Sequence, residues 1–185
     1  MVADAQGNVV AATPSGWSGV VAGETGIWLG SRLQSFNTWV GHPNVIEPGK
    51  RPRITLTPTL ILNKEKQPTF AISVAGGDNQ DQMTLQLIQN QIDFGLSPEE
   101  SVTSPRFMTD HLTGSFGQTP PKLGRVRINP GIGHKSLTEL ARKGHDLEIA
   151  PGPIGAAPVV LAIDPKTKLI RAAGDPRAGR HVSAY

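Results

Sequence analysis

The stretch PGKRPRITLTPTLILNKEKQPTFAISVAGGDNQDQ, residues 48–82, predicts a strand, a turn, a second strand and then a helix. Apolar and β-branched residues indicate strands over residues 55–62 and 69–75, and the charged residues between them are typical of a hairpin turn. Two glycines, Gly76 and Gly77, follow the second strand and directly precede a helical pattern. This order of elements places a glycine pair at a strand-to-helix junction.

Glycines at such a junction leave their backbone N–H groups open, and the free N–H groups of a helix start point the same way. These donors suit an anion, or the oxyanion that develops in an acyl-transfer reaction. A tight turn that needs positive φ selects glycine as well. The glycines by themselves favour neither interpretation over the other.

Further hairpins and helices are expected on either side of this stretch. Asp78 is expected to cap a helix over residues 78–94, and Ser97 to begin a short helix through a capping box with Glu100. Other strands are expected over residues 2–12 (a hairpin), 106–111, 125–128, 146–150, 158–163 and 169–173, and another helix over residues 135–143. Runs of strands with helices between them predict a single α+β layered domain over residues 1–185.

The segment between the N-terminal hairpin and the decisive stretch has a mixed pattern. Residues 18–22 are expected to form a short buried strand, and Trp28 and Phe36 are expected to join the core. Residues 41–52 have the composition of a loop.

The composition excludes several classes of site. The 185 residues contain no cysteine, which excludes disulfides, thiolate metal sites and a cysteine nucleophile. The five histidines show no metal-ligand spacing, and no credible dinucleotide loop is present, so we expect neither a metal nor a cofactor. The net charge is +3 and the basic residues are scattered along the chain. Their densest cluster, Lys50, Arg51 and Arg53, is too short for a nucleic-acid site. No apolar run approaches the length of a membrane span.

Several short motifs then occur together, in an order that one enzyme family shares. They are Asp4-x-x-Gly7-Asn8, residues 18–27 (SGVVAGETGI), residues 48–52 (PGKRP), Thr57-Pro58-Thr59, the glycine pair, residues 173–177 (AGDPR) and the closing Ala184-Tyr185. With these motifs the chain resembles the C-terminal, small subunit of the γ-glutamyltranspeptidase family of N-terminal-nucleophile hydrolases. Residues 13–17, 41–44 and 76–82 resemble its divergent transpeptidase-like and acylase branch more closely.

The resemblance implies a fold and a reaction. The fold is a four-layer αββα sandwich, made from one precursor that cuts itself into a large and a small subunit. The new N-terminal threonine of the small subunit attacks a γ-glutamyl amide, with its own α-amine as base. The acyl group, from a donor such as glutathione, then passes to water or to an amino acceptor.

The resemblance also assigns roles to six residues. For catalysis, Gly76 and Gly77 match the pair whose N–H groups stabilise the oxyanion, and Ser15 matches a threonine that assists the nucleophile. For substrate binding, Thr55 matches the second of two serines that hold the donor's α-carboxylate. Ser35 falls where the family usually has an aspartate for the donor ammonium, and Arg32 where it has a polar residue near that ammonium.

Two departures from the family pattern change what we expect. The threonine opening is missing, and Met1 falls about where the fifth residue of the small subunit would be, so this chain alone should be inactive. Ser35 replaces the aspartate of the family, so a carboxylate is missing near the donor ammonium. Arg32 adds a positive charge at the same place. Donors that carry only a carboxylate, such as glutaryl groups, therefore become plausible beside γ-glutamyl donors.

Three interpretations of the missing nucleophile stay open. The chain is the small subunit of an amide hydrolase or acyltransferase, a non-catalytic scaffold or binding domain derived from one, or a truncated piece of the enzyme. The expected partners are the large subunit of the same precursor and a small-molecule donor, with self-association as another way to cover an open sheet face. The resemblance suggests a periplasmic or extracellular location, although the residues themselves are equally compatible with the cytoplasm.

Overall fold

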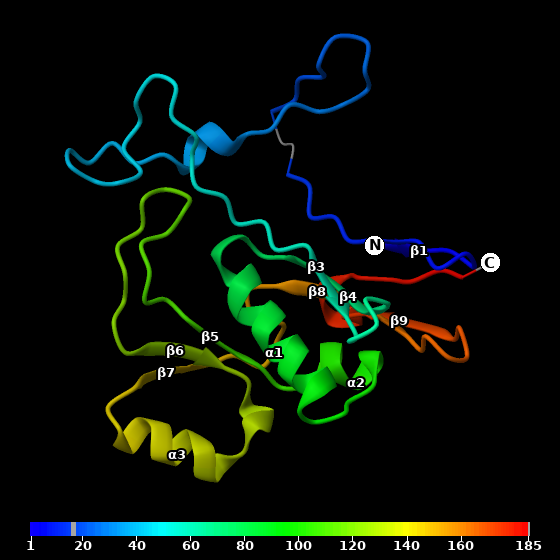
Figure 1. Ribbon diagram of the computed structural model, residues 1–185. Helices are drawn as coiled ribbons and strands as arrows, with labels where there is room; N and C mark the ends of the chain where they lie inside the picture. The colour runs from blue at the N-terminus through cyan, green and yellow to red at the C-terminus, as the bar shows by residue number, and fades with distance from the viewer. Residues whose placement is uncertain (16–17, 185) are drawn as a thin grey trace.

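The computed structural model describes residues 1–15 and 18–184, and its centre is a four-stranded antiparallel sheet (Figure 1). The strands lie in the order β3 (Thr59–Leu62), β4 (Pro68–Ala75), β8 (Ala157–Ile163) and β9 (Ile170–Gly174). The two hairpins pair through their neighbouring strands β4 and β8, with Ile72 opposite Val160. Gly16, Trp17 and Tyr185, which belong to motifs that carry the resemblance, lie outside the described residues.

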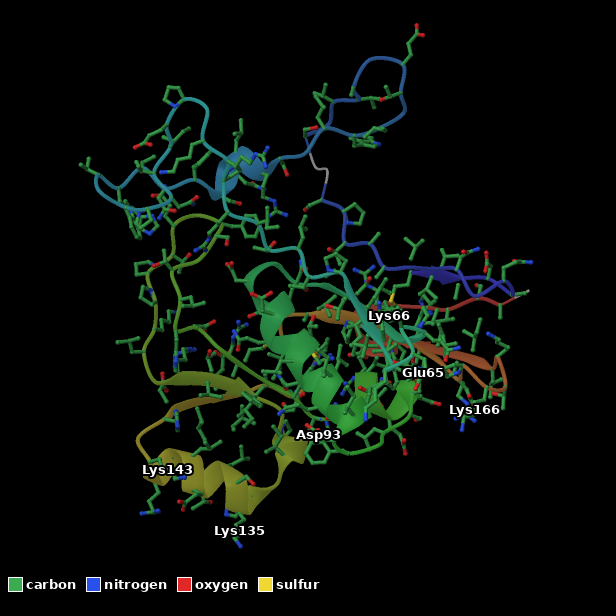
Figure 2. All side chains as sticks on the ribbon, viewed as in Figure 1. Glu65, Lys66, Asp93, Lys135, Lys143 and Lys166 are labelled. Carbon is green, nitrogen blue, oxygen red and sulfur yellow. The ribbon has the colours of Figure 1, made fainter. Side chains whose placement is uncertain are left out.

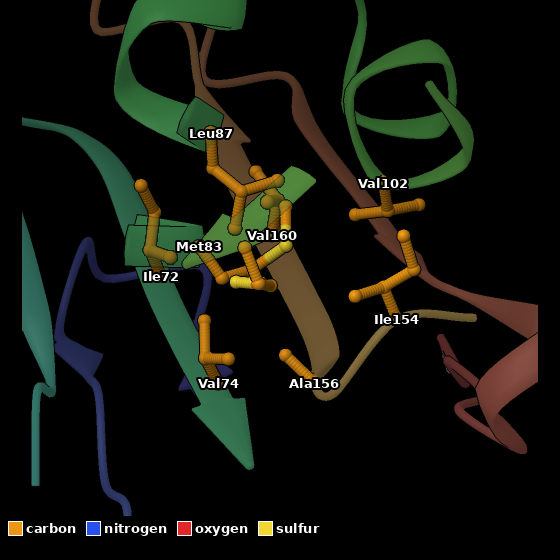
Figure 3. Packing of buried hydrophobic residues seen from close by; sticks show 9 residues of the cluster. Ile72, Val74, Met83, Leu87, Val102, Ile154, Ala156 and Val160 are labelled. Atoms are coloured by element: carbon orange, nitrogen blue, oxygen red, sulfur yellow. The ribbon is translucent and has the colours of Figure 1, made fainter. Parts of the chain in front are cut away.

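Two helices pack on one face of this sheet and enclose the core. They are α1 (Gln80–Ile92) and α2 (Pro98–Thr103). Met83 and Leu87 are four residues apart, so they lie on one side of α1 and pack towards the sheet (Figure 3). The core cluster comprises Ile72, Val74, Met83, Leu87, Val102, Met108, Ile154, Ala156 and Val160. This packing fixes the start of α1, and so the glycine pair, against the end of β4.

A smaller three-stranded sheet lies beyond α1 (Figure 1). It consists of β5 (Phe107–Thr109), β6 (Arg125–Ile128) and β7 (Asp146–Ile149), with β6 and β7 parallel. Parallel neighbours need a crossover, which α3 (His134–Arg142) supplies. Lys135 and Lys143 point outward from this helix and its end (Figure 2). The β5–β6 connection is a long loop over residues 110–124, and it reaches the glycine pair.

The opposite face of the four-stranded sheet is only partly covered within the described residues. The N-terminal hairpin, β1 (Val2–Ala3) and β2 (Val9–Val10), approaches it, and Oγ of Ser73 donates to the carbonyl of Ala12 at 3.2 Å. Leu60 is paired with Ala71 and shares its face, yet it remains exposed. An apolar edge of the sheet is therefore open on the side away from the helices.

The remaining described elements are short 3₁₀ helices: η1 (Arg32–Ser35), η2 (Gly77–Asn79), η3 (Pro130–Ile132) and η4 (Pro176–Ala178). No helix within the described ranges has both the length and the apolar character needed to cross a membrane.

The structure confirms the α+β class, the hairpins and the capping box, in which Ser97 and Glu100 bond each other's backbone N–H. Four expectations about local structure are wrong. Residues 55–58 are not part of β3, which begins at Thr59. Pro58 has no backbone N–H to donate to a neighbouring strand. Asp78 does not cap α1, because its carboxylate accepts hydrogen bonds from Ser115 instead.

The third wrong expectation concerns residues 18–22. They form no buried strand and contribute only an isolated bridge between Val21 and Trp28. The fourth concerns Trp28, which is 56% exposed and does not join the core, whereas Phe36 is buried as expected. The segment extends away from the central sheet (Figure 1), so its apolar side chains have no described layer to pack against.

Candidate active site at the glycine pair

Gly76 and Gly77 link the end of β4 to η2 and α1, and the local geometry requires glycine at both positions. A β-carbon built on Gly76 would lie 2.5 Å from the carbonyl oxygen of Gly155. Gly77 has a φ of +55°, which side chains other than glycine rarely adopt. Within the described part of the chain neither N–H donates a hydrogen bond. Two backbone donors at a helix start are therefore open to an anionic group.

The glycine pair lines a cavity of about 390 Å³ together with two other predicted site residues, Ser15 and Thr55. Ser15 arrives on the segment after β2, and Thr55 on the extended chain before β3. Residues that are far apart in sequence thus meet at one end of the central sheet. The structure brings together all three predicted catalytic residues and one of the three predicted substrate-binding residues.

The other two predicted residues lie in η1, behind this cavity. Nη1 of Arg32 donates to Oγ1 of Thr55 at 3.1 Å, so Arg32 reaches the cavity wall through Thr55. Ser35 is buried and outside the lining, and its hydroxyl has no partner among the described residues. Its backbone carbonyl accepts from Asn44. A direct role for Ser35 in donor recognition stays a prediction.

Sequence reasoning missed several residues that line the cavity, among them Met1, Thr13, Ser73, Gln80, Phe116 and Arg180. The hydroxyl of Thr13 is buried without a partner among the described residues, so it is available to a polar group. The alternation of β4 could have indicated Ser73, because its neighbours Ile72 and Val74 face the helices. No local pattern points to Phe116, which comes from the β5–β6 loop.

The residues that follow the glycine pair fasten it to its surroundings. Nδ2 of Asn79 donates to the carbonyl of Gly155 at 3.0 Å, and Oε1 of Gln80 accepts from Thr57 at 3.3 Å. Gln82 bonds the backbone of Thr109 twice, accepting from its N–H at 2.8 Å and donating to its carbonyl at 3.0 Å. Each side chain holds a different segment, so the N–H groups of the pair have fixed directions.

A buried ion pair holds the chain that carries Arg180. The carboxylate of Asp175 accepts from Arg106 and from the backbone N–H of Arg177, and the Asp175 carbonyl accepts from the N–H of Arg180 at 3.0 Å. Burial raises the pKa of Asp175, but hydrogen bonds from Arg177 and Arg106 outweigh it, so the pKa lies below its ordinary value. Asp175 is therefore a structural anion.

The arrangement suits acyl transfer. Open N–H groups at a helix start can stabilise a developing oxyanion, and hydroxyls of Ser15, Thr13 and Thr55 are available for positioning. Within residues 1–15 and 18–184 no three histidine, aspartate or glutamate side chains are grouped so that they could hold a metal ion. Met1 also lines the cavity.

Known proteins with sequences similar to this chain include hydrolase-like and acylase proenzymes. The glutathione hydrolase-like YwrD proenzyme of Bacillus subtilis (strain 168) is 28% identical over 182 residues, covering 95% of this chain and 33% of that protein. The acylase ACY 1 proenzyme of Pseudomonas sp. (strain SE83) is 30% identical over 176 residues, covering 93% of this chain and 29% of that protein. The chain thus spans about a third of the length of these relatives.

Solved structures give the same answer for the fold. The γ-glutamyltranspeptidase from Pseudomonas nitroreducens complexed with L-DON superposes with a TM-score of 0.76 at 24% identity, covering 100% of this chain and 96% of that one. The cephalosporin acylase from Bacillus halodurans has a TM-score of 0.68 at 28% identity, covering 83% of this chain and 26% of that one. The family model described as gamma-glutamyltranspeptidase matches residues 1–185, and the chain therefore belongs to the γ-glutamyltranspeptidase family.

Proposed function

We propose that this chain is the small-subunit region of an amide hydrolase or acyltransferase that cleaves γ-glutamyl amides such as glutathione, or related acyl amides. One observation carries the proposal: the open N–H groups of Gly76 and Gly77 line the same cavity as Ser15 and Thr55. An oxyanion hole needs such fixed donors beside the reacting carbonyl. Family membership and relatives that include hydrolases and acylases support the same reaction class.

The nucleophile in this proposal is a threonine on the chain that precedes Met1. Its hydroxyl attacks the amide carbonyl and its α-amine takes the proton, then returns it to the amide nitrogen, which leaves as an amine when the C–N bond breaks. Gly76 and Gly77 stabilise the tetrahedral oxyanion, and Ser15 supports the nucleophile. Water or an amine then releases the acyl group from the threonine. The position of Met1 in the cavity wall supports this entry point.

Arg32 and Thr55 form the proposed site for the donor carboxylate. None of the ion pairs in the described part of the chain involves Arg32, so its charge remains available. Its bond to Thr55 directs the guanidinium towards the cavity. With no carboxylate at Ser35, the site favours acyl groups that carry a carboxylate without an ammonium. Glutaryl amides are therefore the proposed preferred donors over γ-glutamyl amides.

A large subunit from the same precursor is the proposed partner. The relatives named above are proenzymes. The exposed Leu60 lies on the face of the central sheet that the helices leave open. A second layer on this face would cover it and complete the αββα sandwich. Residues 1–185 act in this proposal as one domain of the assembled enzyme.

The test compares the complete protein with residues 1–185 alone. The complete protein should release the chromophore from glutaryl and γ-glutamyl anilides with saturable kinetics. Residues 1–185 should release none above a heat-treated control, because oxyanion donors stabilise an intermediate that nothing generates. Saturable turnover by the isolated chain, or none by the complete cleaved protein with any acyl anilide, would contradict the proposal.

A further inference from the structure

Phe116 lies directly against the glycine pair, although it comes from the loop between β5 and β6. A β-carbon built on Gly77 would lie 3.1 Å from Cε2 of Phe116, so the ring fills the space beside this glycine. The guanidinium carbon of Arg32 lies 5.7 Å from the ring centroid, within cation–π range. Phe116 thus contacts both the proposed oxyanion donor and the proposed carboxylate-binding residue.

Two hollows meet at Phe116. One is the cavity of about 390 Å³, and the other, of about 340 Å³, lies between the start of α1 and the β5–β6 loop. Among the described residues only Gly76, Gly77 and Phe116 line both. The second hollow is walled by polar side chains that include Asp110, Thr119, Lys122 and Arg127. Since the two glycines have no side chains, Phe116 contributes the only side chain among the described residues that lines both hollows.

A set of three side chains, the Arg53–Asp78–Ser115 clamp, holds Phe116 in this place. The carboxylate of Asp78 accepts from the N–H of Ser115 at 2.7 Å and also from its hydroxyl. Nε of Arg53 donates to the same hydroxyl at 2.7 Å, and its Nη2 to the carbonyl of Thr113 at 2.6 Å. Arg53 and Asp78 are 3.5 Å apart as an ion pair. The clamp therefore joins the chain before β3, the residue after the glycine pair, and the loop.

A second tether fixes the other side of Phe116. Oε1 of Gln118 accepts from the backbone N–H of Thr38 at 3.1 Å and from its hydroxyl at 3.2 Å. The loop is thus bonded on both sides of the ring, and the buried Ser115 directly precedes it. The chain on both sides of Phe116 is therefore held in place, while the Phe116 side chain is 39% exposed.

We propose that the Arg53–Asp78–Ser115 clamp positions Phe116 as a gate between the two hollows, and that the second hollow admits the amine that receives the acyl group. The inference rests on the proposed acyl-transfer function. In the transfer step the amine nitrogen attacks the acyl carbon, the ester bond to the threonine breaks, and the amine proton passes to the threonine oxygen, which leaves as a hydroxyl. Phe116 keeps water from the ester while the amine is bound, so its size sets the ratio of transfer to hydrolysis.

The experiment measures this ratio in the complete protein, with a glutaryl anilide as donor and the dipeptide Ala-Gly as acceptor. Phe116→Ala should lower the transfer-to-hydrolysis ratio about tenfold while kcat/KM for donor cleavage changes less. Asp78→Ala should lower the ratio similarly, and Asp78→Asn, which keeps one acceptor oxygen, should fall between. Phe94→Ala is the matched control, because Phe94 is 71% exposed at the far end of α1 and should leave the ratio unchanged.

The outcomes separate a gate from general damage. If Asp78 acts through Phe116, the double variant should lose no more than Phe116→Ala alone. An unchanged ratio in Phe116→Ala, or additive losses in the double variant, would overturn the inference. If the wild-type protein turns over no acyl amide, the proposed function fails and the gate with it. Hydrogen exchange still tests the clamp then: the Ser115 amide should exchange faster in Asp78→Ala, and unchanged protection would overturn that part too.

Discussion

Replacing Asp175 by alanine should destabilise the protein more than any change of a surface charge. The Asp175 carboxylate is 0% exposed, and the Arg106 side chain that it pairs with is 1% exposed. After the change, the Arg106 guanidinium keeps, among the described residues, only its Nη1 bonds to the carbonyl of Val102 at 3.4 Å and, weakly, to the sulfur of Met83. Removing one partner of a buried pair leaves an uncompensated charge, and the cost is about 3–5 kcal/mol.

Asp146→Ala is the matched control. Asp146 bonds Arg125 at 3.2 Å, but its side chain is 67% exposed, and Arg125 keeps a bond to Glu148 at 2.6 Å. An exposed pair of this kind contributes about 0–1 kcal/mol. Both variants remove an aspartate that pairs with an arginine, but only Asp175 is buried and also accepts hydrogen bonds from Arg177.

The assay is urea unfolding of the complete protein, followed by circular dichroism, for the wild type and both variants. The free energy of unfolding should fall several times more for Asp175→Ala than for Asp146→Ala. In the double variant Arg106→Met with Asp175→Ala, most of the loss should return, because no charge remains buried. Equal losses for Asp175→Ala and Asp146→Ala would refute the reasoning.

The remaining predictions concern pH and the site. Because folding lowers the pKa of Asp175, its contribution to the free energy of unfolding should be complete above its unfolded pKa of about 3.9. That contribution should disappear as the pH falls through the folded pKa. If the difference in unfolding free energy between the wild type and Asp175→Asn did not depend on pH, this prediction would be contradicted. Gly77→Val should reduce kcat about 10²–10³-fold with little change in KM, and wild-type turnover would show that the glycine only shapes a turn. Thr55→Val removes the partner of Arg32 and should raise KM for carboxylate-bearing donors about tenfold; an unchanged KM would place the carboxylate elsewhere. Ser35→Asp should shift preference towards γ-glutamyl over glutaryl donors about 10- to 100-fold, and an unchanged ratio would place Ser35 outside the site.

Local patterns predicted the elements whose causes are local. The β3–β4 hairpin follows from alternation around a polar turn, and the Ser97 capping box from two residues three positions apart. Asp78 failed as a predicted cap because a better set of donors, the N–H and hydroxyl of Ser115, reaches it from 37 residues away. A cap and a tertiary acceptor have the same sequence signature, so only the fold distinguishes them.

Site residues could be predicted from the sequence where a local pattern marks them, and could not where distant segments place them. Gly76 and Gly77 were visible because a strand-to-helix junction and a family resemblance agreed on them. Phe116 was not visible, because nothing in a loop of mixed composition indicates which side chain will reach the glycine pair. Its position depends on Arg53 and Asp78, which belong to two other segments.

The polar residues after the glycine pair have a common physical role. An oxyanion hole works only if its donors are fixed before the reaction, since donors that reorganise during it lose most of their effect. Backbone donors can be held only through their neighbours. Asp78 holds the β5–β6 loop, Asn79 the chain before β8, Gln80 the chain before β3, and Gln82 the edge strand β5. Side chains that read as a polar helix start in sequence therefore fix the surroundings of the two glycine N–H groups from four directions.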